Sequence, residues 1–494
     1  MATTLDTPDS AIQLDDETRA AFSPVTFLTR TVVPVAMVLA TLVAMVRVAA
    51  APLSNPDTYF HLRFGSEFLH HWSLRHPGHV TTWATADWVP TQWLPQELMA
   101  RLEESFGLAG VAWYAGFQFV AVTLALYLAA RRWADRVVAA PLLIVALLAC
   151  SPGFSMRPQV LSYLGAALTV ALWMSVRYGT GRVLWRAAAT VPLIWLWAMC
   201  HGMWPLGVII SATAVAALVL DGSARGVRAV QLAAAPVAAG LAAGILTPVG
   251  PALLPAVLLV NSRGQYFSEW APPDFTAPNC LALLLMLAVT VLLMVRRGSD
   301  WFMIAMVGLS AGFAVYSGRT VPVAACMLVP LGARTIQGLL GDSQRLRRVE
   351  RSLAFAAAAA SLVILAAIVP STSDQPPPQP KWVDPALTSL PGGTRILNDE
   401  SFGGFLMWRY PDLDFMFSGY GDIYTTKELK AMSEINDVKP GWDDKVRAAR
   451  PAYALLDPDT ALAYALTHGQ GWTVVHHDED VELLAPPAGW MDQS

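Results

Sequence analysis

Eleven long apolar runs restrict this chain to folds that cross a membrane repeatedly. They lie at 27–50, 108–130, 137–153, 158–176, 186–202, 204–220, 229–247, 279–295, 301–317, 320–341 and 352–370. A helix needs roughly 20 apolar residues to cross about 30 Å of hydrocarbon. Charged residues make up only 14% of the 494 residues, whereas soluble domains carry about a quarter. We therefore predict an α-helical polytopic membrane protein with about 11 transmembrane helices.

The loops that alternate along these runs differ in arginine content, which predicts the orientation of the chain. One set contains Arg131, Arg132, Arg136, Arg177, Arg182, Arg186, Arg225, Arg228, Arg296, Arg297, Arg345, Arg347, Arg348 and Arg351. The opposite set contains Arg47, Arg63, Arg75, Arg101, Arg157, Arg263 and Arg319. Because positively charged loops favour the cytoplasm, we expect the first set inside. Residues 1–24 then form a disordered cytoplasmic tail, and the loop at 51–107 lies outside.

A proline-rich segment divides the chain into two parts. Residues 371–380 form a stiff linker, and all five lysines lie beyond it. We predict a transmembrane domain at 25–370 and a small extracytoplasmic α/β domain at 381–494. Its expected strands are 395–398, 415–418, 453–456 and 472–476, and its expected helices are 426–435, 442–449 and 460–468. The Gly403-Gly404 pair is expected in a loop.

The first outer loop carries the sharpest candidate for catalysis. Asp57 and His61 are four residues apart, so they share one face of a helix. The carboxylate of Asp57 could take a proton from a hydroxyl acceptor, or it could bind a divalent cation. It could equally cap the helix that follows Asn55-Pro56. His61 could orient Asp57 or donate to a phosphate, or it could belong to a solvated interfacial helix.

A second segment of the same loop is also polar and aromatic. Residues 92–97 precede an amphipathic helix expected at about 95–106. Pro95 and Glu97 suit the first turn of that helix, but Glu97 could instead be a second carboxylate near Asp57. Trp93 could stack on a sugar ring, or it could join an interfacial belt of tryptophans.

Several cationic side chains are expected at the outer ends of spans. These are Arg157, His201, Arg263 and Arg319. A phosphate leaving group gathers negative charge as its bond breaks, so cations would stabilise it. The alternative is that they extend to lipid headgroups. Glu269-Trp270 falls on the same predicted face, which favours one site built from several loops.

Several motifs in the chain resemble those of bacterial multi-spanning proteins within the GT-C glycosyltransferase superfamily. They are Pro56–Gly65, Thr91–Glu97, Met156-Arg157-Pro158-Gln159, Cys200-His201-Gly202, Glu269–Phe275 and Gly403–Arg409, and they cover the chain from about 50 to 425. Members of the superfamily carry sugars from polyprenyl-phosphate or polyprenyl-diphosphate donors to acceptors outside the membrane. The acidic motif of the superfamily falls on Asn55-Pro56-Asp57, where only the second acid is present. That departure favours a base that works without metal, with Asp57 as the ligand if a divalent cation is used.

The resemblance implies a membrane glycosyltransferase of the bacterial plasma membrane. It would take a polyprenyl-phosphate-linked sugar as donor and a glycan or protein as acceptor. The implied catalytic residues are Asp57, His61 and Glu97; the implied phosphate-binding residues are Arg157, His201, Arg263 and Arg319; and the implied acceptor- or sugar-binding residues are Trp93, Gln96, Glu269 and Trp270. A net charge of −4 gives no footprint for nucleic acid. The alternatives are a non-catalytic envelope assembly factor and a lipid or glycan transporter.

Overall fold

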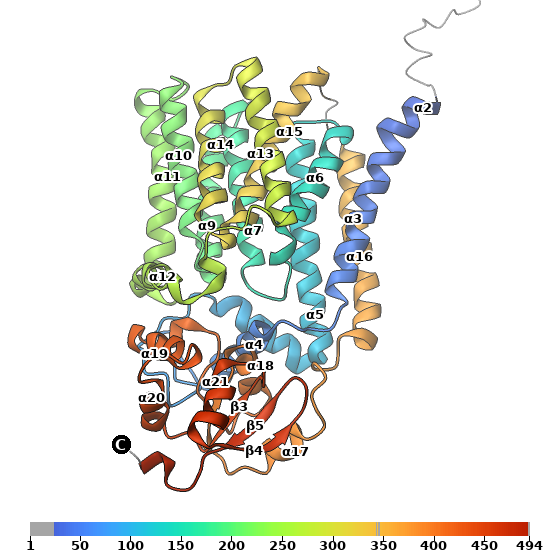
Figure 1. Ribbon diagram of the computed structural model, residues 1–494. Helices are drawn as coiled ribbons and strands as arrows, with labels where there is room; N and C mark the ends of the chain where they lie inside the picture. Colours follow the sequence, from blue (N-terminus) through green and yellow to red (C-terminus); the bar gives the residue numbers. More distant parts are fainter. Residues whose placement is uncertain (1–23, 342, 344–345, 493–494) are drawn as a thin grey trace, which may run out of the picture.

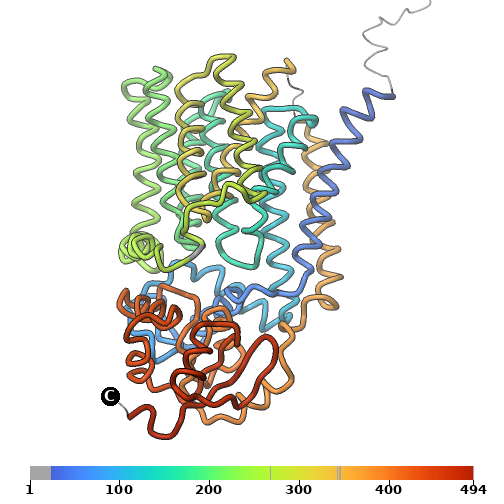
Figure 2. The backbone as a smooth tube through the Cα atoms, viewed as in Figure 1, coloured from blue at the N-terminus to red at the C-terminus, as the bar shows by residue number. Residues whose placement is uncertain are grey.

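A computed structural model describes residues 24–341, 343 and 346–492, and it shows a helical bundle with a mixed sheet domain at one end (Figure 1). The predicted tail at 1–24 lies outside the described residues except for its last residue. The backbone trace in Figure 2 brings the first polar loop and the C-terminal domain to the same end of the bundle. The two regions predicted to lie on one side of the membrane are therefore neighbours.

Nine helices among the described residues are long and apolar enough to cross a membrane. They are α2–α3 (Pro24–Ala49), α5 (Trp93–Arg131), α6 with η2 (Arg136–Gly153), α7 (Val160–Tyr178), α8–α9 (Val183–Cys200), α11 (Gly226–Ile245), α13 (Pro278–Arg297), η6–α15 (Gly318–Leu340) and α16 (Arg348–Thr372). Two shorter apolar helices, α10 (Pro205–Leu220) and α14 (Trp301–Tyr316), run beside them (Figure 1). Every apolar run expected from the sequence thus forms a helix, and the predicted fold class is confirmed. α16 extends two residues into the predicted linker.

One further apolar helix, α12 (Leu253–Ser262), lies across the bundle at the edge that faces the sheet domain (Figure 1). Its ten residues are too few to cross hydrocarbon, and Leu254 and Leu258 are exposed on it. The loop that follows contains the short turns η4 (Gly264–Tyr266) and η5 (Ser268–Trp270). α12 therefore places the Glu269 segment at the end of the bundle.

The polar loop begins with α4 (Pro56–His70), and its first turn explains the residue at position 55. The side chain of Asn55 accepts a hydrogen bond from the backbone N–H of Asp57 at 2.9 Å. Asn55 is therefore the N-cap, with Pro56 at the first helical position. Because Asn55 caps the helix, the carboxylate of Asp57 is available for other contacts.

α4 packs against α5, which joins the predicted amphipathic helix and the second membrane span into one element. A Cβ at Gly65 would lie 2.0 Å from the carbonyl oxygen of Gln96, so only glycine allows this approach. α5 is interrupted at Gly107, whose φ of 64° is a conformation that favours glycine. The break separates the part of α5 near the polar loop from the part inside the bundle.

The C-terminal domain contains a five-stranded sheet in the order β2-β1-β3-β5-β4. Its strands are β1 (Arg395–Asn398), β2 (Asp414–Phe415), β3 (Tyr453–Leu456), β4 (Thr473–His477) and β5 (Glu482–Ala485). β1 pairs in parallel with β2 and β3, and β5 pairs antiparallel with β3 and β4. The predicted bounds of β1 and β3 are correct, β2 and β4 are shifted, and β5 was not predicted.

The helices of this domain cover the sheet and contact the polar loop. They are α17 (Val383–Thr388), α18 (Glu400–Arg409), α19 (Thr426–Asn436), α20 (Trp442–Ala449) and α21 (Ala461–Tyr464), with η8 (Ala465–Gly469) continuing α21 and two single turns, η7 (Gly421–Ile423) and η9 (Trp490–Asp492). α19, α20 and α21–η8 correspond to the predicted helices. α17 and α18 were missed.

The prediction of a loop at Gly403-Gly404 is wrong, because both glycines lie inside α18. A Cβ at Gly403 would lie 1.8 Å from the carbonyl oxygen of Phe417, and one at Gly404 would lie 2.4 Å from that of Pro56. The pair therefore serves close packing rather than a turn. It brings the start of α18 beside the start of α4.

Candidate functional site

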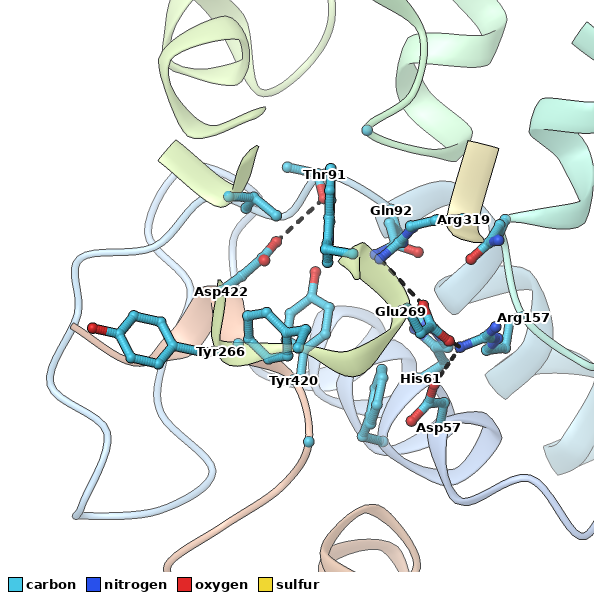
Figure 3. A pocket seen from close by; sticks show the side chains of 18 of the residues that line it. Asp57, His61, Thr91, Gln92, Arg157, Tyr266, Glu269, Arg319, Tyr420 and Asp422 are labelled. Atoms are coloured by element: carbon cyan, nitrogen blue, oxygen red, sulfur yellow. Dashed lines mark hydrogen bonds and ion pairs between the residues drawn. The ribbon is translucent and has the colours of Figure 1, made fainter. Parts of the chain in front are cut away.

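A cavity of about 630 Å³ lies between the end of the helical bundle and the C-terminal domain (Figure 3). Seven of the eleven predicted site residues line it, namely Asp57, His61, Arg157, His201, Glu269, Trp270 and Arg319. They come from α4, from the start of η6–α15 and from three loops that follow α6, α9 and α12. Segments far apart in the sequence thus contribute to one site.

An ion network crosses one wall of this cavity (Figure 3). Nη1 of Arg157 donates to Oδ2 of Asp57 at 2.7 Å and also to Oε1 of Glu269. Oε2 of Glu269 lies 3.5 Å from Nη1 of Arg319. The guanidinium of Arg319 also lies 5.3 Å from the ring centroid of Trp270, close enough for a cation–π contact. Two carboxylates and two guanidinium groups therefore alternate along one chain of contacts.

The two carboxylates in this network have different proton affinities. Burial raises the pKa of Asp57 above its ordinary value, and the charges of Arg157 and, last in size, Arg319 only partly oppose that effect. Burial also acts on Glu269, but Arg319 and Arg157 together hold its pKa below the ordinary value. Asp57 is consequently the better proton acceptor, and Glu269 is the better counter-ion.

The imidazole of His61 is buried and neutral. Only 2% of the residue is exposed, and its Nδ1 lies 2.9 Å from Nε2 of Gln96. Burial, followed by the charges of Arg157 and Arg319, holds the pKa of His61 well below its ordinary value. Gln96 does not line the cavity but lies behind His61 and fixes its ring.

The structure contradicts the sequence-based expectation that His201 is a cation. The residue is 2% exposed, and burial together with Arg319 holds its pKa well below the ordinary value. Its Nδ1 lies 2.9 Å from Oγ of Ser162, and its Nε2 lies 3.2 Å from Nη2 of Arg319. A cationic imidazole would be repelled by that guanidinium, so His201 is neutral.

Two other predicted site residues do not line the cavity. Arg263 donates from Nη1 to the carbonyl oxygen of Tyr424 at 2.8 Å, which ties the Glu269 loop to the C-terminal domain. Glu97 lies beside Gln96 on α5, and successive helical residues point about 100° apart. Because Gln96 faces His61, Glu97 faces elsewhere, and Glu269 takes the place expected for a second carboxylate near Asp57.

Trp93 does not line the cavity either, whereas Trp270 does. Trp93 begins α5 and is partly buried against the main hydrophobic core. A role in packing therefore accounts for its position, and the aromatic surface at the cavity comes from Trp270, beneath Arg319.

The C-terminal domain supplies lining residues that sequence analysis did not identify. Asp399, Glu400, Tyr420 and Asp422 are among them. Burial, then Asp399 and Asp57, raises the pKa of Glu400, and Asp422 accepts a hydrogen bond from Thr91 at 3.3 Å. Their only sequence signal is the glycine-rich stretch at 418–422 and the acidic pair that precedes Gly403-Gly404.

Hydrogen bonds hold this domain against the polar loop. Asp414 accepts from Thr81 at 2.7 Å, and Glu103 accepts from Nε1 of Trp408 at 2.6 Å. With the Arg263 contact and the packing of Gly404 on α4, they connect the domain to the bundle at several separate points. The wall that the domain contributes is therefore part of the folded site.

The arrangement at Asp57 does not fit a divalent cation. In the part of the chain that the structure describes, no group of three or more His, Cys, Asp or Glu residues could hold a metal ion. Asp57 already pairs with Arg157, and a guanidinium in that position would repel a cation.

Comparison with known proteins supports the architecture. No protein-family model matches the sequence, and no curated protein sequence matches it. Among solved structures, the apo form of ArnT from Cupriavidus metallidurans is similar at a TM-score of 0.53 and 15% identity, over 92% of this chain and 98% of that one. The oligosaccharyltransferase of Archaeoglobus fulgidus, tethered with an acceptor peptide that contains the NVT sequon, is similar at a TM-score of 0.52 and 14% identity, over 87% of this chain and 70% of that one. The chain has a GT-C-like fold.

Proposed function

We propose that this GT-C-like chain is a membrane glycosyltransferase that moves a sugar from a polyprenyl-phosphate donor to an extracytoplasmic acceptor. One observation carries the proposal: Asp57, whose pKa is raised, shares a cavity with the guanidinium groups of Arg157 and Arg319. A proton acceptor beside two phosphate-binding cations is what transfer of a sugar from a phosphate to a hydroxyl requires.

The cations are suited to an incoming phosphate because their hydrogen bonding is incomplete. The Nε atoms of Arg157 and Arg319 are buried and have no acceptor among the residues that the structure describes. A donor phosphate would compete with Glu269 for both guanidinium groups, since each prefers an anionic acceptor. The bound phosphate, which becomes the leaving group, would then accept hydrogen bonds from Arg157. Its charge would weaken the contact between Arg157 and Asp57.

The proposed reaction inverts the configuration at the anomeric carbon of the sugar. The acceptor hydroxyl oxygen forms a bond to that carbon while the carbon–oxygen bond to phosphate breaks. The electron pair leaves with the polyprenyl phosphate, where Arg157 and Arg319 stabilise the growing charge. The acceptor proton passes to the carboxylate of Asp57.

The orientation and domain roles form part of the proposal. We propose that the N-terminal tail lies in the cytoplasm and that the polar loop and the domain at 381–494 lie outside a bacterial plasma membrane, an orientation that the arginine distribution supports. The acceptor, a glycan or a protein, would enter from the side of Glu400 and Asp422. The location of the cavity beside the sheet domain, away from the middle of the bundle, supports a transferase over a transporter.

The test uses purified protein in liposomes that contain a panel of polyprenyl-phosphate-linked hexoses and pentoses. We expect sugar release or transfer by the wild type, and a loss of about 100-fold or more in Asp57→Asn, with folding unchanged. Glu104→Gln is the matched control, since Glu104 is exposed, pairs with His70 and lies outside the cavity. A wild-type rate in Asp57→Asn would show that Asp57 is not the catalytic base. Passage of lipid across the bilayer without sugar transfer would favour a transporter, and neither activity would favour an assembly factor.

A further inference from the structure

His201 ends a membrane helix at the floor of the cavity. It is the C-cap of α9, and its extended backbone (φ −164°, ψ 143°) turns the chain away from the helix. The side chain is buried yet lines the cavity. It therefore occupies a fixed place between the bundle and the site.

The partners of the imidazole define which nitrogen carries its proton. A guanidinium only donates, so Nε2 of His201 accepts from Arg319 at 3.2 Å. A neutral imidazole has one N–H, which must then be on Nδ1 and points to Oγ of Ser162 at 2.9 Å. The backbone N–H of Met203 also approaches Nδ1, at 3.3 Å, and would favour the opposite form. Arg319 decides between the two forms, because its nitrogens cannot accept a hydrogen bond.

A second layer of side chains holds the imidazole. Oγ of Ser162 accepts a hydrogen bond from Nε1 of Trp197 at 2.8 Å, and Trp197 is 3% exposed. Ser162 and Trp197 belong to α7 and α9, two helices that pack together in the bundle. The orientation of His201 is therefore set by the rigid part of the fold.

Arg319 is in turn oriented by two acceptors. Nη2 meets His201, Nη1 lies 3.5 Å from Glu269, and Trp270 lies beneath the guanidinium group. When a phosphate displaces Glu269, His201 is the acceptor that stays. Of the side chains that orient the guanidinium group, His201 is then the hydrogen-bond acceptor and Trp270 the aromatic surface beneath it.

We infer that His201 is a positioning residue, which orients Arg319 toward the donor phosphate through its neutral Nε2 and binds no phosphate itself. The inference rests on the proposed function, which identifies the phosphate as that of the donor. It adds that Arg319 binds this phosphate, whereas the neutral His201 orients Arg319.

The test compares two substitutions of similar size. In His201→Gln the amide oxygen can reach the position of Nε2, whereas in His201→Asn it reaches only the position of Nδ1. We expect His201→Gln to bind polyprenyl phosphate in liposomes within about threefold of the wild type, and His201→Asn to lose about tenfold, the worth of one hydrogen bond to a charged group. Arg319→Gln provides the second arm of a double-mutant cycle.

If His201 acts through Arg319, His201→Asn has little further effect on binding in the Arg319→Gln background. Equal losses in both backgrounds, or equal binding by the Asn and Gln variants, would overturn the inference. Sugar transfer is measured separately on the same proteins. If the double-mutant cycle shows coupling but no sugar is transferred, the proposed reaction is overturned and the positioning role of His201 stands. If sugar is transferred but the two substitutions are additive, the positioning role is overturned and the proposed reaction stands.

Discussion

Two networks of arginine and carboxylate groups lie at opposite ends of the bundle, and they differ in whether their hydrogen bonding is complete. In the network away from the cavity, Glu350 of α16 accepts from Nε and Nη2 of Arg131 at 2.6 and 2.8 Å. It also accepts from Arg136 at 2.9 Å and from the hydroxyl of Tyr127 at 3.0 Å. These contacts fasten α16 to α5 and α6.

The Glu350 network is closed, whereas the network at the cavity is open. Nη1 of Arg131 donates to the carbonyl oxygen of Ala134, so each nitrogen of this guanidinium has an acceptor. The side chains of Arg131 and Glu350 are 2% and 9% exposed, against 30% for Asp57 and 38% for Glu269. The same residue types thus stabilise the fold at one end and leave bonding capacity for a ligand at the other.

The sharpest test of this contrast removes the shared cation of the open network. We expect Arg157→Gln to lower kcat about 1000-fold, because the leaving phosphate loses a charged donor. Initial rates at saturating donor measure the effect. Arg101→Gln, an exposed arginine of α5, should leave the rate unchanged, and a rate within tenfold of wild type in Arg157→Gln would contradict the proposed role.

The counterpart in the closed network should affect folding. Glu350→Gln leaves the buried Arg131 without a charged partner, so we expect the free energy of unfolding to fall by about 3 kcal/mol. Denaturant titration of the purified protein measures it, with Glu104→Gln as the exposed control. The affinity of the folded fraction for polyprenyl phosphate should be unchanged, and a selective loss of that affinity would show that the two networks are not separate in function.

A glutamate-to-glutamine substitution in the open network should change the affinity for polyprenyl phosphate and leave the stability nearly unchanged. Glu269→Gln removes the carboxylate that competes with phosphate for Arg157 and Arg319, so polyprenyl phosphate should bind about tenfold more tightly. Stability should change little, because Glu269 is partly solvated. Weaker binding in this variant would mean that Glu269 contacts the substrate directly.

Sequence patterns were sufficient for the bundle because membrane helices need long apolar runs and every such run is visible. They also brought Asp57, Arg157, Glu269 and Arg319 to one membrane face, since alternate loops share a side. The charge state of His201 could not be predicted, because it depends first on burial in the folded protein and then on Arg319, 118 residues away. Arg263 is predicted to bind phosphate from its charge and its place at the outer end of a span, whereas in the structure it donates to the carbonyl of Tyr424 and to Thr426 in the C-terminal domain.

The wall formed by the C-terminal domain could not be predicted for a related reason. Gly403-Gly404 has the composition of a turn, and only the contacts with Phe417 and Pro56 show that it permits close packing of a helix. Without that packing there was no reason to place Glu400 near Asp57. In the same way, the choice between Glu97 and Glu269 depended on which face of α5 meets His61.

The smallest expected effect concerns the pH dependence of the open network. Transfer requires the carboxylate form of Asp57, so the rate falls as pH falls through its pKa. Burial raises that pKa above 3.8, the ordinary value, so the acid limb of kcat/KM should lie at a higher pH than for a solvated aspartate. Arg157 opposes the shift, so the residual activity of Arg157→Gln should show a limb at still higher pH. His61 and His201 should add no limb near 6.5, because burial holds both of their pKa values well below it. A limb that stays in place in Arg157→Gln would mean that a group other than Asp57 takes the proton.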